Sequence, residues 1–297
     1  MKYPAIASRF DGSVWAILPG KLDEIKAFVA SKINGRPVMA FMDSDGEEEA
    51  PLAYKAGSVG VINIVGTIMQ RVSSLERSSG GVSSEEIGVA FDSLMADASV
   101  SAIVLNIDSP GGSVYGMHDL ADKIYEARES KKIVAFANPL AASAAYLIGS
   151  AASEFYATRD GEVGSVGVFG VHIDMSEADK MEGFKYTYIS AGKYKTEGNP
   201  HEPLSDEAKD HAQEAVDWHY SQLLKAIGRH RGISAGKVAS DFGEGRTVMA
   251  DKAKAAGMID GTRKNLGEVV SRLQPRGRAT GTAKARMALM EKLYLAS

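Results

Sequence analysis

The 297-residue sequence contains no cysteine. This absence excludes disulfide bonds, a cysteine nucleophile, zinc sites built on thiolates and iron–sulfur clusters. The six histidines show no His-Glu-x-x-His pattern of a zinc peptidase. The acidic stretch at 43–50 lacks the ligand spacing of an EF-hand loop. We therefore expect a solvated linker at 43–50 and no metal site.

Long hydrophobic runs are also missing. The longest apolar or small stretch, PLAASAAYLIGSAA at 139–152, is shorter than the roughly 20 residues of a membrane-spanning helix. Arg9 and Asp11 interrupt the start of the chain, which holds no apolar run of a signal peptide. We expect a protein that stays in the cytoplasm in which it is made, with no membrane partner.

An excess of positive charge is absent as well. The chain carries 34 Lys and Arg against 38 Asp and Glu, a net charge of −4. This balance gives no reason to expect nucleic acid as a partner. Hydrophobic residues make up 44% of the chain, which is enough for a sizeable core of a globular protein.

Three parts are expected along the chain. Residues 1–50 combine a helix over 18–33, indicated by apolar residues at helical spacing, with the acidic linker. Residues 51–274 alternate strands with helices and begin with a buried strand, VGVINIVGTIM, at 59–69. Residues 275–297 are a basic tail with a flexible linker and a terminal helix. The alternation predicts βαβ units and a mainly parallel sheet in an α/β fold.

The expected elements of the middle part follow from the same patterns. A capping box at Ser83–Glu86 opens a helix that runs to about residue 96. Further strands are expected at 101–107, 131–138, 155–158, within 163–174 and at 184–192. Further helices are expected from the turn at 108–113 to about 130, and at 141–152, 205–231, 233–242 and 247–260.

The turn DSPGGS at 108–113 is the first candidate for chemistry. Pro110 fixes one backbone angle, and Gly111 and Gly112 allow positive φ and close backbone approach. Such a turn can aim free N–H groups at an anionic oxygen, although it can also be a plain connection between a strand and a helix. The dinucleotide fingerprint G-x-G-x-x-G and the P-loop pattern are both absent, and no cofactor is expected.

Ser143 is the second candidate. It stands at the start of an Ala-rich helix, where small neighbours leave space around its hydroxyl. The N–H of Ala144 and the positive end of the helix dipole could stabilise an oxyanion. The alternative is an ordinary N-cap serine. The pattern G-x-S-x-G is absent, which argues against an α/β-hydrolase.

A serine nucleophile needs a base, and the sequence offers two kinds. One is His172 with Asp174 in VHID, and the other is Lys193 or Lys195 in AGKYKTEGNP. A lysine can act as a base only when it is neutral, so burial would have to lower its pKa from about 10.4 by several units. The residues alone do not choose between these partners.

The motifs occur in an order that resembles the signal peptide peptidase A family, serine proteases on the ClpP/crotonase fold of repeated ββα units. The motifs are SPGG, ASAAYLIGSAA, GSVGV, AGKYKTEGNP and EGRTVMADKAKAAGMID, and they extend the resemblance from about 59 to 260. Both KTEGNPHEPLSDEA and the N-terminal WAILPGKLDEI are similar to the phage and prophage branch, which includes lambda-type capsid maturation proteases.

The resemblance implies a set of site residues. Ser143 matches the family's nucleophile, Lys195 its general base, and Ser165 a serine that orients the lysine. Gly111 or Gly112, together with the Ala144 N–H, matches the oxyanion hole. Many family members have glycines directly after the nucleophile, whereas this chain has alanines, so we expect a tighter pocket.

The resemblance also implies a function and partners. It predicts a serine endopeptidase with a Ser-Lys dyad that cleaves scaffold, portal or capsid proteins during phage head maturation, in the host cytoplasm or the prohead. It predicts a closed homo-oligomeric ring, with sites built across subunit boundaries, and small or apolar side chains at the cleavage site. The alternatives are a cytoplasmic peptidase that degrades signal or other peptides, a non-catalytic scaffold ring, an acyl-CoA enzyme of the crotonase type, and a triad of Ser143, His172 and Asp174.

Overall fold

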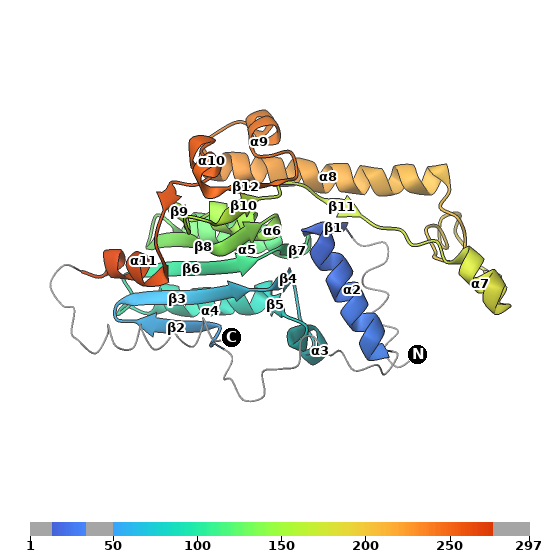
Figure 1. Ribbon diagram of the computed structural model, residues 1–297, viewed down its shortest axis with the longest axis horizontal. Coiled ribbons are helices and arrows are strands. Elements are labelled where there is room, and N and C mark those ends of the chain that lie inside the picture. The colour runs from blue at the N-terminus through green and yellow to red at the C-terminus, as the bar shows by residue number, and fades with distance from the viewer. Residues whose placement is uncertain (1–13, 34–49, 276–297) are drawn as a thin grey trace.

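The structure is a computed structural model that describes residues 14–33 and 50–275 (Figure 1). Most of the predicted acidic linker and nearly all of the predicted basic tail lie outside these ranges. Within the ranges, no helix combines the length and the apolar character needed to cross a membrane.

The larger of two sheets has the strand order β12-β10-β8-β6-β3-β2. Strands β3, β6, β8 and β10 run parallel, whereas β2 and β12 join the two ends of this series antiparallel. Strand β9 pairs with β8 and with β13. The bounds are β2 (Ala53–Ala56), β3 (Val59–Val65), β6 (Ala102–Ser109), β8 (Lys132–Ala142), β9 (Glu154–Ala157), β10 (Glu162–Gly164), β12 (Thr247–Met249) and β13 (Gly261–Thr262). The predicted α/β class with a mainly parallel sheet is confirmed.

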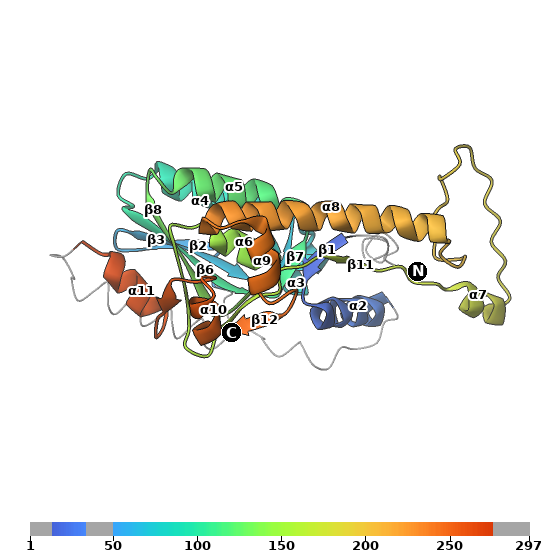
Figure 2. The same ribbon diagram turned by 90° about the horizontal axis from the view of Figure 1, so that it is seen from above.

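Helices cover both faces of this sheet (Figure 2). Because side chains alternate along a strand, Val61 points to one face of β3 and Ile62 to the other. The face with Val61 packs against α11 (Leu266–Leu273). The face with Ile62 forms the main core with α4 (Ser84–Ala96), α5 (Met117–Ala127) and α6 (Ala144–Ser150).

Helix α4 begins where the capping box predicted. The Ser83 hydroxyl accepts a hydrogen bond from the Glu86 N–H at 3.3 Å. This bond satisfies one of the four N–H groups that the first turn of a helix leaves unpaired.

The smaller sheet has the order β11-β1-β7-β4-β5. Strand β1 is antiparallel to both of its neighbours, whereas β7, β4 and β5 are parallel. The bounds are β1 (Val14–Ile17), β4 (Thr67–Met69), β5 (Gly81–Ser83), β7 (Gly111–Ser113) and β11 (Phe169–Gly170), and α3 (Ser74–Ser78) lies between β4 and β5. Helix α2 (Pro19–Ile33) follows β1, as its spacing predicted. The predicted N-terminal unit therefore contributes a strand to a sheet of the predicted protease domain.

Residues 171–205 form an arm that projects beyond both sheets (Figures 1 and 2). The arm contains α7 (Ser176–Glu182) and leads into the long helix α8 (Asp206–Arg231). It has internal contacts of its own. The ring of His201 stacks on Tyr186 with centroids 3.6 Å apart, and its Nδ1 lies 2.7 Å from Oδ2 of Asp179.

The sequence-based prediction of a strand at 184–192 is wrong. The segment lies on the arm without a partner strand in the described chain, and Phe184, Tyr186 and Tyr188 are exposed. Their alternation is typical of a strand, but a strand forms only where a sheet edge is available for pairing. Other bounds also differ, because 141–142 end β8 ahead of α6 and Gly111–Ser113 form β7 within the predicted turn. Of the helix predicted at 247–260, the first three residues instead form β12, which pairs with β10, and α10 covers only 250–255.

The last turn of α8 packs into the core. The helices α9 (Ala235–Asp241) and α10 (Ala250–Ala255) follow it in the chain. Nδ1 of His230 lies 2.9 Å from the hydroxyl of Ser150, and its ring stacks on Tyr125. Burial lowers the pKa of His230 to about 3, and the neighbouring Arg229 cation adds to the effect. His230 is therefore neutral in the fold at neutral pH.

This pKa predicts acid sensitivity of the fold. The unfolded chain binds a proton at this ring near pH 6.5, and the folded chain only near 3, so acidification between these values favours unfolding. This one group should remove about 2 kcal/mol of unfolding free energy between pH 6.5 and pH 5. Urea unfolding at both pH values should show a smaller loss for His230→Gln than for wild type. His211→Gln, at an exposed position, serves as control, and equal losses in all three proteins would contradict the assignment.

Candidate active site

Ser143 stands at the junction between β8 and α6 in a strained backbone conformation. Its φ is 55° and its ψ is −114°, in a region that residues with a side chain rarely adopt. Its N–H donates to the Gly164 carbonyl at 2.6 Å, which holds the residue outside the helix. Its hydroxyl makes no capping bond to α6 and instead donates to the Gly167 carbonyl at 3.2 Å. The hydroxyl of Ser143 is therefore not used as a helix cap.

Ser165 is the neighbour of this junction. It directly follows Gly164, the residue that accepts the Ser143 N–H, and its own N–H donates to the Arg246 carbonyl at 2.8 Å. Its φ is 50°, also in the left-handed region, and only 5% of its surface is exposed. The structure thus brings the two serines singled out by the sequence into one buried backbone cluster.

The two glycines of the SPGG turn pack against the same cluster. A methyl group on Gly111 would lie 3.0 Å from Cβ of Ser143, and one on Gly112 would lie 1.8 Å from the Ile68 carbonyl oxygen. Gly111 also has a φ of 101°. These close approaches require glycine at both positions and place the turn beside Ser143.

The Gly111 N–H is held by a residue that sequence reasoning missed. It donates to the Ser109 hydroxyl at 3.2 Å, and that hydroxyl donates to the Gly66 carbonyl at 2.6 Å. Gly111 would have to leave Ser109 to bind an oxyanion. The only sequence signal for this role is a serine placed directly before Pro110.

Ala144 is the first residue of α6 and is fully buried. The first N–H groups of a helix have no partner within the helix, and the positive end of the helix dipole lies there. With the SPGG turn on the other side of Ser143, this geometry suits the binding of a developing oxyanion.

Lys195 lies elsewhere in the described chain. It is exposed on the arm, in a shallow depression shared with Tyr188 and Asn199. Its neighbours Lys193 and Tyr194 bind Glu207 in the first turn of α8, at 2.9 and 2.8 Å. The structure of a single chain does not bring Lys195 to Ser143 or Ser165.

The length of α8 explains the separation. The helix rises about 1.5 Å per residue, so the stretch from Glu207 to His230 covers roughly 35 Å. Glu207 is tied to the arm, whereas His230 is tied to Ser150 at the end of α6. The arm and the nucleophile's helix are therefore attached to opposite ends of α8.

The histidine alternative finds little support in the contacts. Oδ1 of Asp174 accepts the Ser176 N–H at 2.9 Å, at the start of α7. Nε2 of His172 is buried and has no hydrogen-bond partner among the described residues. Asp174 thus bonds to the start of a helix, and its interaction with His172 is electrostatic, without a hydrogen bond between the two side chains among the described contacts.

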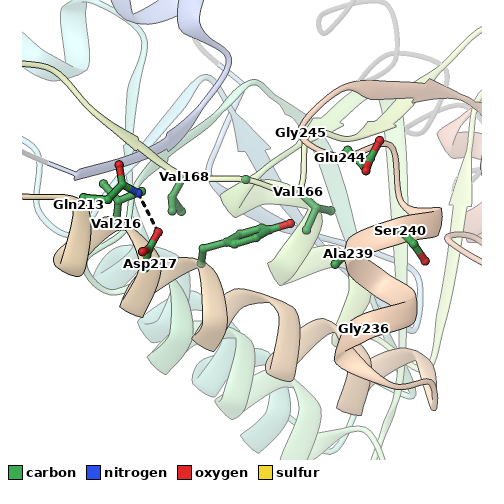
Figure 3. A pocket seen from close by; sticks show the side chains of 12 residues that line it. Val166, Val168, Gln213, Val216, Asp217, Gly236, Ala239, Ser240, Glu244 and Gly245 are labelled. Atoms are coloured by element: carbon green, nitrogen blue, oxygen red, sulfur yellow. Dashed lines mark hydrogen bonds between the residues drawn. The ribbon is translucent and has the colours of Figure 1, made fainter. Parts of the chain in front are cut away.

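A groove of about 590 Å³ adjoins the site at Gly167, the residue that accepts the Ser143 hydroxyl. Figure 3 shows other residues that line this groove. It lies between the segment after Ser165 and the helices α8 and α9. Asp217, which accepts from Gln213 at 2.7 Å, and Glu244 give it two carboxylates. No group of three or more acidic or histidine side chains suited to a metal occurs in residues 14–33 and 50–275.

Known proteins match the sequence that forms this site. The model of peptidase family S49 matches residues 126–277. Capsid assembly protease C of Escherichia phage lambda is 30% identical over 218 residues, which is 73% of this chain and 49% of that protein. Head-tail preconnector protein GP5 of Enterobacteria phage P21 is 31% identical over 193 residues, 65% of this chain and 38% of that protein.

A third relative comes from a cellular organism. Protease 4 of Haemophilus influenzae is 24% identical over 203 residues, 68% of this chain and 32% of that protein. The chain spans less than half of the length of each of these three relatives. The family match covers half of the chain and includes the segments that carry Ser143, Ser165 and Lys195. The chain belongs to peptidase family S49.

Proposed function

We propose that the chain is a serine endopeptidase with Ser143 as its nucleophile. The observation that carries this proposal is the strained backbone of Ser143, at a strand–helix junction and next to two obligatory glycines. Strain of this kind clusters at functional sites because the surrounding structure must maintain it. The family match supports the same assignment.

The general base in this proposal is Lys195 of a second copy of the chain. Ser143 is buried, and its hydroxyl bonds only to a backbone carbonyl among the described contacts. Lys195 is presented on a projecting arm, away from the core of its own chain. A head-to-tail arrangement, in which the arm of one subunit reaches the next, joins both groups and leads to a closed ring.

The surface of the arm supports such docking. Its exposed apolar side chains include Met181, Phe184, Tyr188, Tyr194 and Ile189, the last of which is 99% exposed. A soluble protein rarely leaves so many large apolar side chains in water on one segment. Burial of this surface against a neighbour would also lower the pKa of a lysine that it carries, as a base requires.

The proposed mechanism follows from these positions. Neutral Lys195 takes the proton from Oγ of Ser143, which attacks the peptide carbonyl, and Ser165 holds the ammonium group in place. N–H groups of the SPGG turn and of Ala144 stabilise the oxyanion. The lysine then protonates the leaving amine, and water hydrolyses the acyl-enzyme.

The substrates we propose are structural proteins of a phage head. The two phage relatives are named as a capsid assembly protease and a head-tail preconnector protein. Extended segments of scaffold, portal or capsid chains would be the sites of cleavage, because a ring of subunits would restrict access to such segments. Incubation with a candidate scaffold or portal protein, followed by mass spectrometry of the products, tests this choice of substrate.

A mixing experiment tests the dyad and its division between subunits. Ser143→Ala and Lys195→Ala should each abolish cleavage of casein. After dissociation and joint reassembly, about a quarter of the sites should combine an intact serine with an intact lysine from the neighbour. Cleavage should then return to about a quarter of the wild-type rate.

Lys185→Ala, another exposed lysine on the arm, is the control and should keep wild-type activity. No recovery in the mixture, with reassembly shown by analytical ultracentrifugation, would rule out a site shared between subunits. Substantial activity in Lys195→Ala alone would rule out the dyad.

An arginine at position 195 should not replace the lysine as general base. Lys195→Arg keeps the positive charge, but a guanidinium group cannot lose its proton at working pH. We expect no casein cleavage and no labelling of Ser143 by a fluorophosphonate probe, measured by intact mass. Labelling of Lys195→Arg at the wild-type rate would show that charge alone is sufficient.

A further inference from the structure

Strand β1 lies between two strands that border the candidate active site. On one side it pairs with β7, where Ile17 is opposite Gly111 and Trp15 is opposite Ser113. On the other side it pairs with β11, where Val14 is opposite Gly170. Strand β7 contains the glycines of the SPGG turn, and β11 follows shortly after Ser165.

The backbone of β1 passes close to the nucleophile. A methyl group on Gly111 would lie 2.2 Å from the Ala16 carbonyl oxygen and 3.0 Å from Cβ of Ser143. Ala16 and Ser143 thus both lie against the side of Gly111 where a side chain would be. The Leu18 N–H donates to the Pro110 carbonyl at 2.9 Å, which continues the pairing past the end of the strand.

Without β1, the edges of β7 and β11 would face each other unpaired. Two such edges can hold an extended peptide by main-chain hydrogen bonds, the usual way in which a strand is added to a sheet. A peptide held there would run past Ser143, as a protease requires of its substrate. We call this position between β7 and β11 the strand site.

The side chains of β1 show what the strand site accepts. Ala16 is fully buried in the main core, where a larger side chain would meet close-packed neighbours. Trp15 and Ile17 point the other way and pack with Leu22 of α2 and with Phe169. The pattern is a small side chain between two bulky apolar ones.

We propose that the strand site is the peptide-binding site of this protease, that β1 is its resident occupant, and that a substrate enters by replacing β1 with a segment of the same pattern. The proposal rests on the proposed function, because it takes Ser143 as the nucleophile. It adds a substrate class, extended apolar segments with a small residue beside Ser143, and an internal competitor for them.

The competition has a clear energetic basis. A strand on the same chain has a high effective concentration, so an external peptide binds only in the fraction of molecules whose site is open. Strand β1 is only four residues long, and Trp15 is its largest anchor. Loss of that anchor should increase the open fraction.

A binding experiment tests this without relying on catalysis. The probe is a fluorescein-labelled peptide with the sequence of residues 14–19, and the Ser143→Ala background prevents its cleavage. By fluorescence anisotropy, Trp15→Ala in this background should bind the probe at least about tenfold more tightly than the background alone. Val269→Ala, which shortens a buried side chain on the other face of the larger sheet, is the matched control and should bind like the background. Equal affinities of Trp15→Ala and the control would overturn the proposal.

The same assay tests the side-chain pattern. A peptide with Phe in place of Ala16 should bind Trp15→Ala at least about tenfold more weakly than the parent peptide, because the inward position is closely packed. Equal binding of the two peptides would overturn the proposed pattern.

A reversible lock provides a second variant in case Trp15→Ala fails to fold. The chain has no cysteine, so Trp15→Cys with Ser113→Cys introduces its only two thiols, at directly opposed positions of an antiparallel pair. The reduced protein should bind the probe at least about tenfold more tightly than the oxidised protein. The same affinity in both forms would overturn the proposal.

The proposed peptidase activity is tested by a measurement that does not depend on peptide binding. Fluorophosphonate labelling of the assembled Trp15→Ala protein with Ser143 intact, in which the strand site is more often open, reports whether Ser143 is a nucleophile. Absence of labelling, together with the expected peptide binding, would reject the peptidase and leave β1 as the occupant of a peptide-binding site.

Discussion

The hydrogen bond from the Ser143 N–H to the Gly164 carbonyl joins the parts of the site. It fixes the end of β8 against the end of β10, at the place where the chain turns into α6. The bond keeps Ser143 at positive φ, which directs its hydroxyl away from the helix and toward the segment after Ser165. The parallel pairing of β8 with β10 holds the residues directly before this junction.

The glycines complete the junction from the side of the smaller sheet. Gly112 touches the backbone of β4 so closely that no side chain fits, and Gly111 faces Ser143 in the same way. The Ser109 hydroxyl links this turn to Gly66 at the end of β3. The ends of β6, β8 and β10 thus meet near the Ser143 hydroxyl. The larger sheet, to which all three strands belong, supplies the rigidity that the strained residues require.

Local signals in the sequence predicted much of this. The helix start at Ser83, the long helix to Arg231 and the strand at 101–107 all depend on residues close together in the chain, and all were found. The single strand predicted at 59–69 is divided at Gly66 into β3 and β4, which belong to different sheets. The SPGG turn and Ser143 were singled out as separate features, and the structure places them side by side. The predicted strand at 184–192 does not form, because alternating apolar residues indicate that a segment can be a strand but not whether a partner strand is available to pair with it. The pairing of β1 with β7 was missed because it joins four residues to a segment almost a hundred positions away. Ser109 was missed because a serine before proline has no pattern of its own.

The attachment of the arm to the far end of α8 has a consequence for assembly. If the arm of each subunit supplies Lys195 to the next one, an open head-to-tail series leaves one Ser143 without a lysine at one end and one Lys195 without a serine at the other. Closure into a ring removes both defects at once. The helix also acts as a lever, because a tilt of 5° over roughly 35 Å moves the arm by about 3 Å, more than a proton transfer tolerates. If the arm supplies the lysine, proteolysis therefore depends on the curvature of the ring, and an incorrectly closed ring would be inactive without any separate inhibitor.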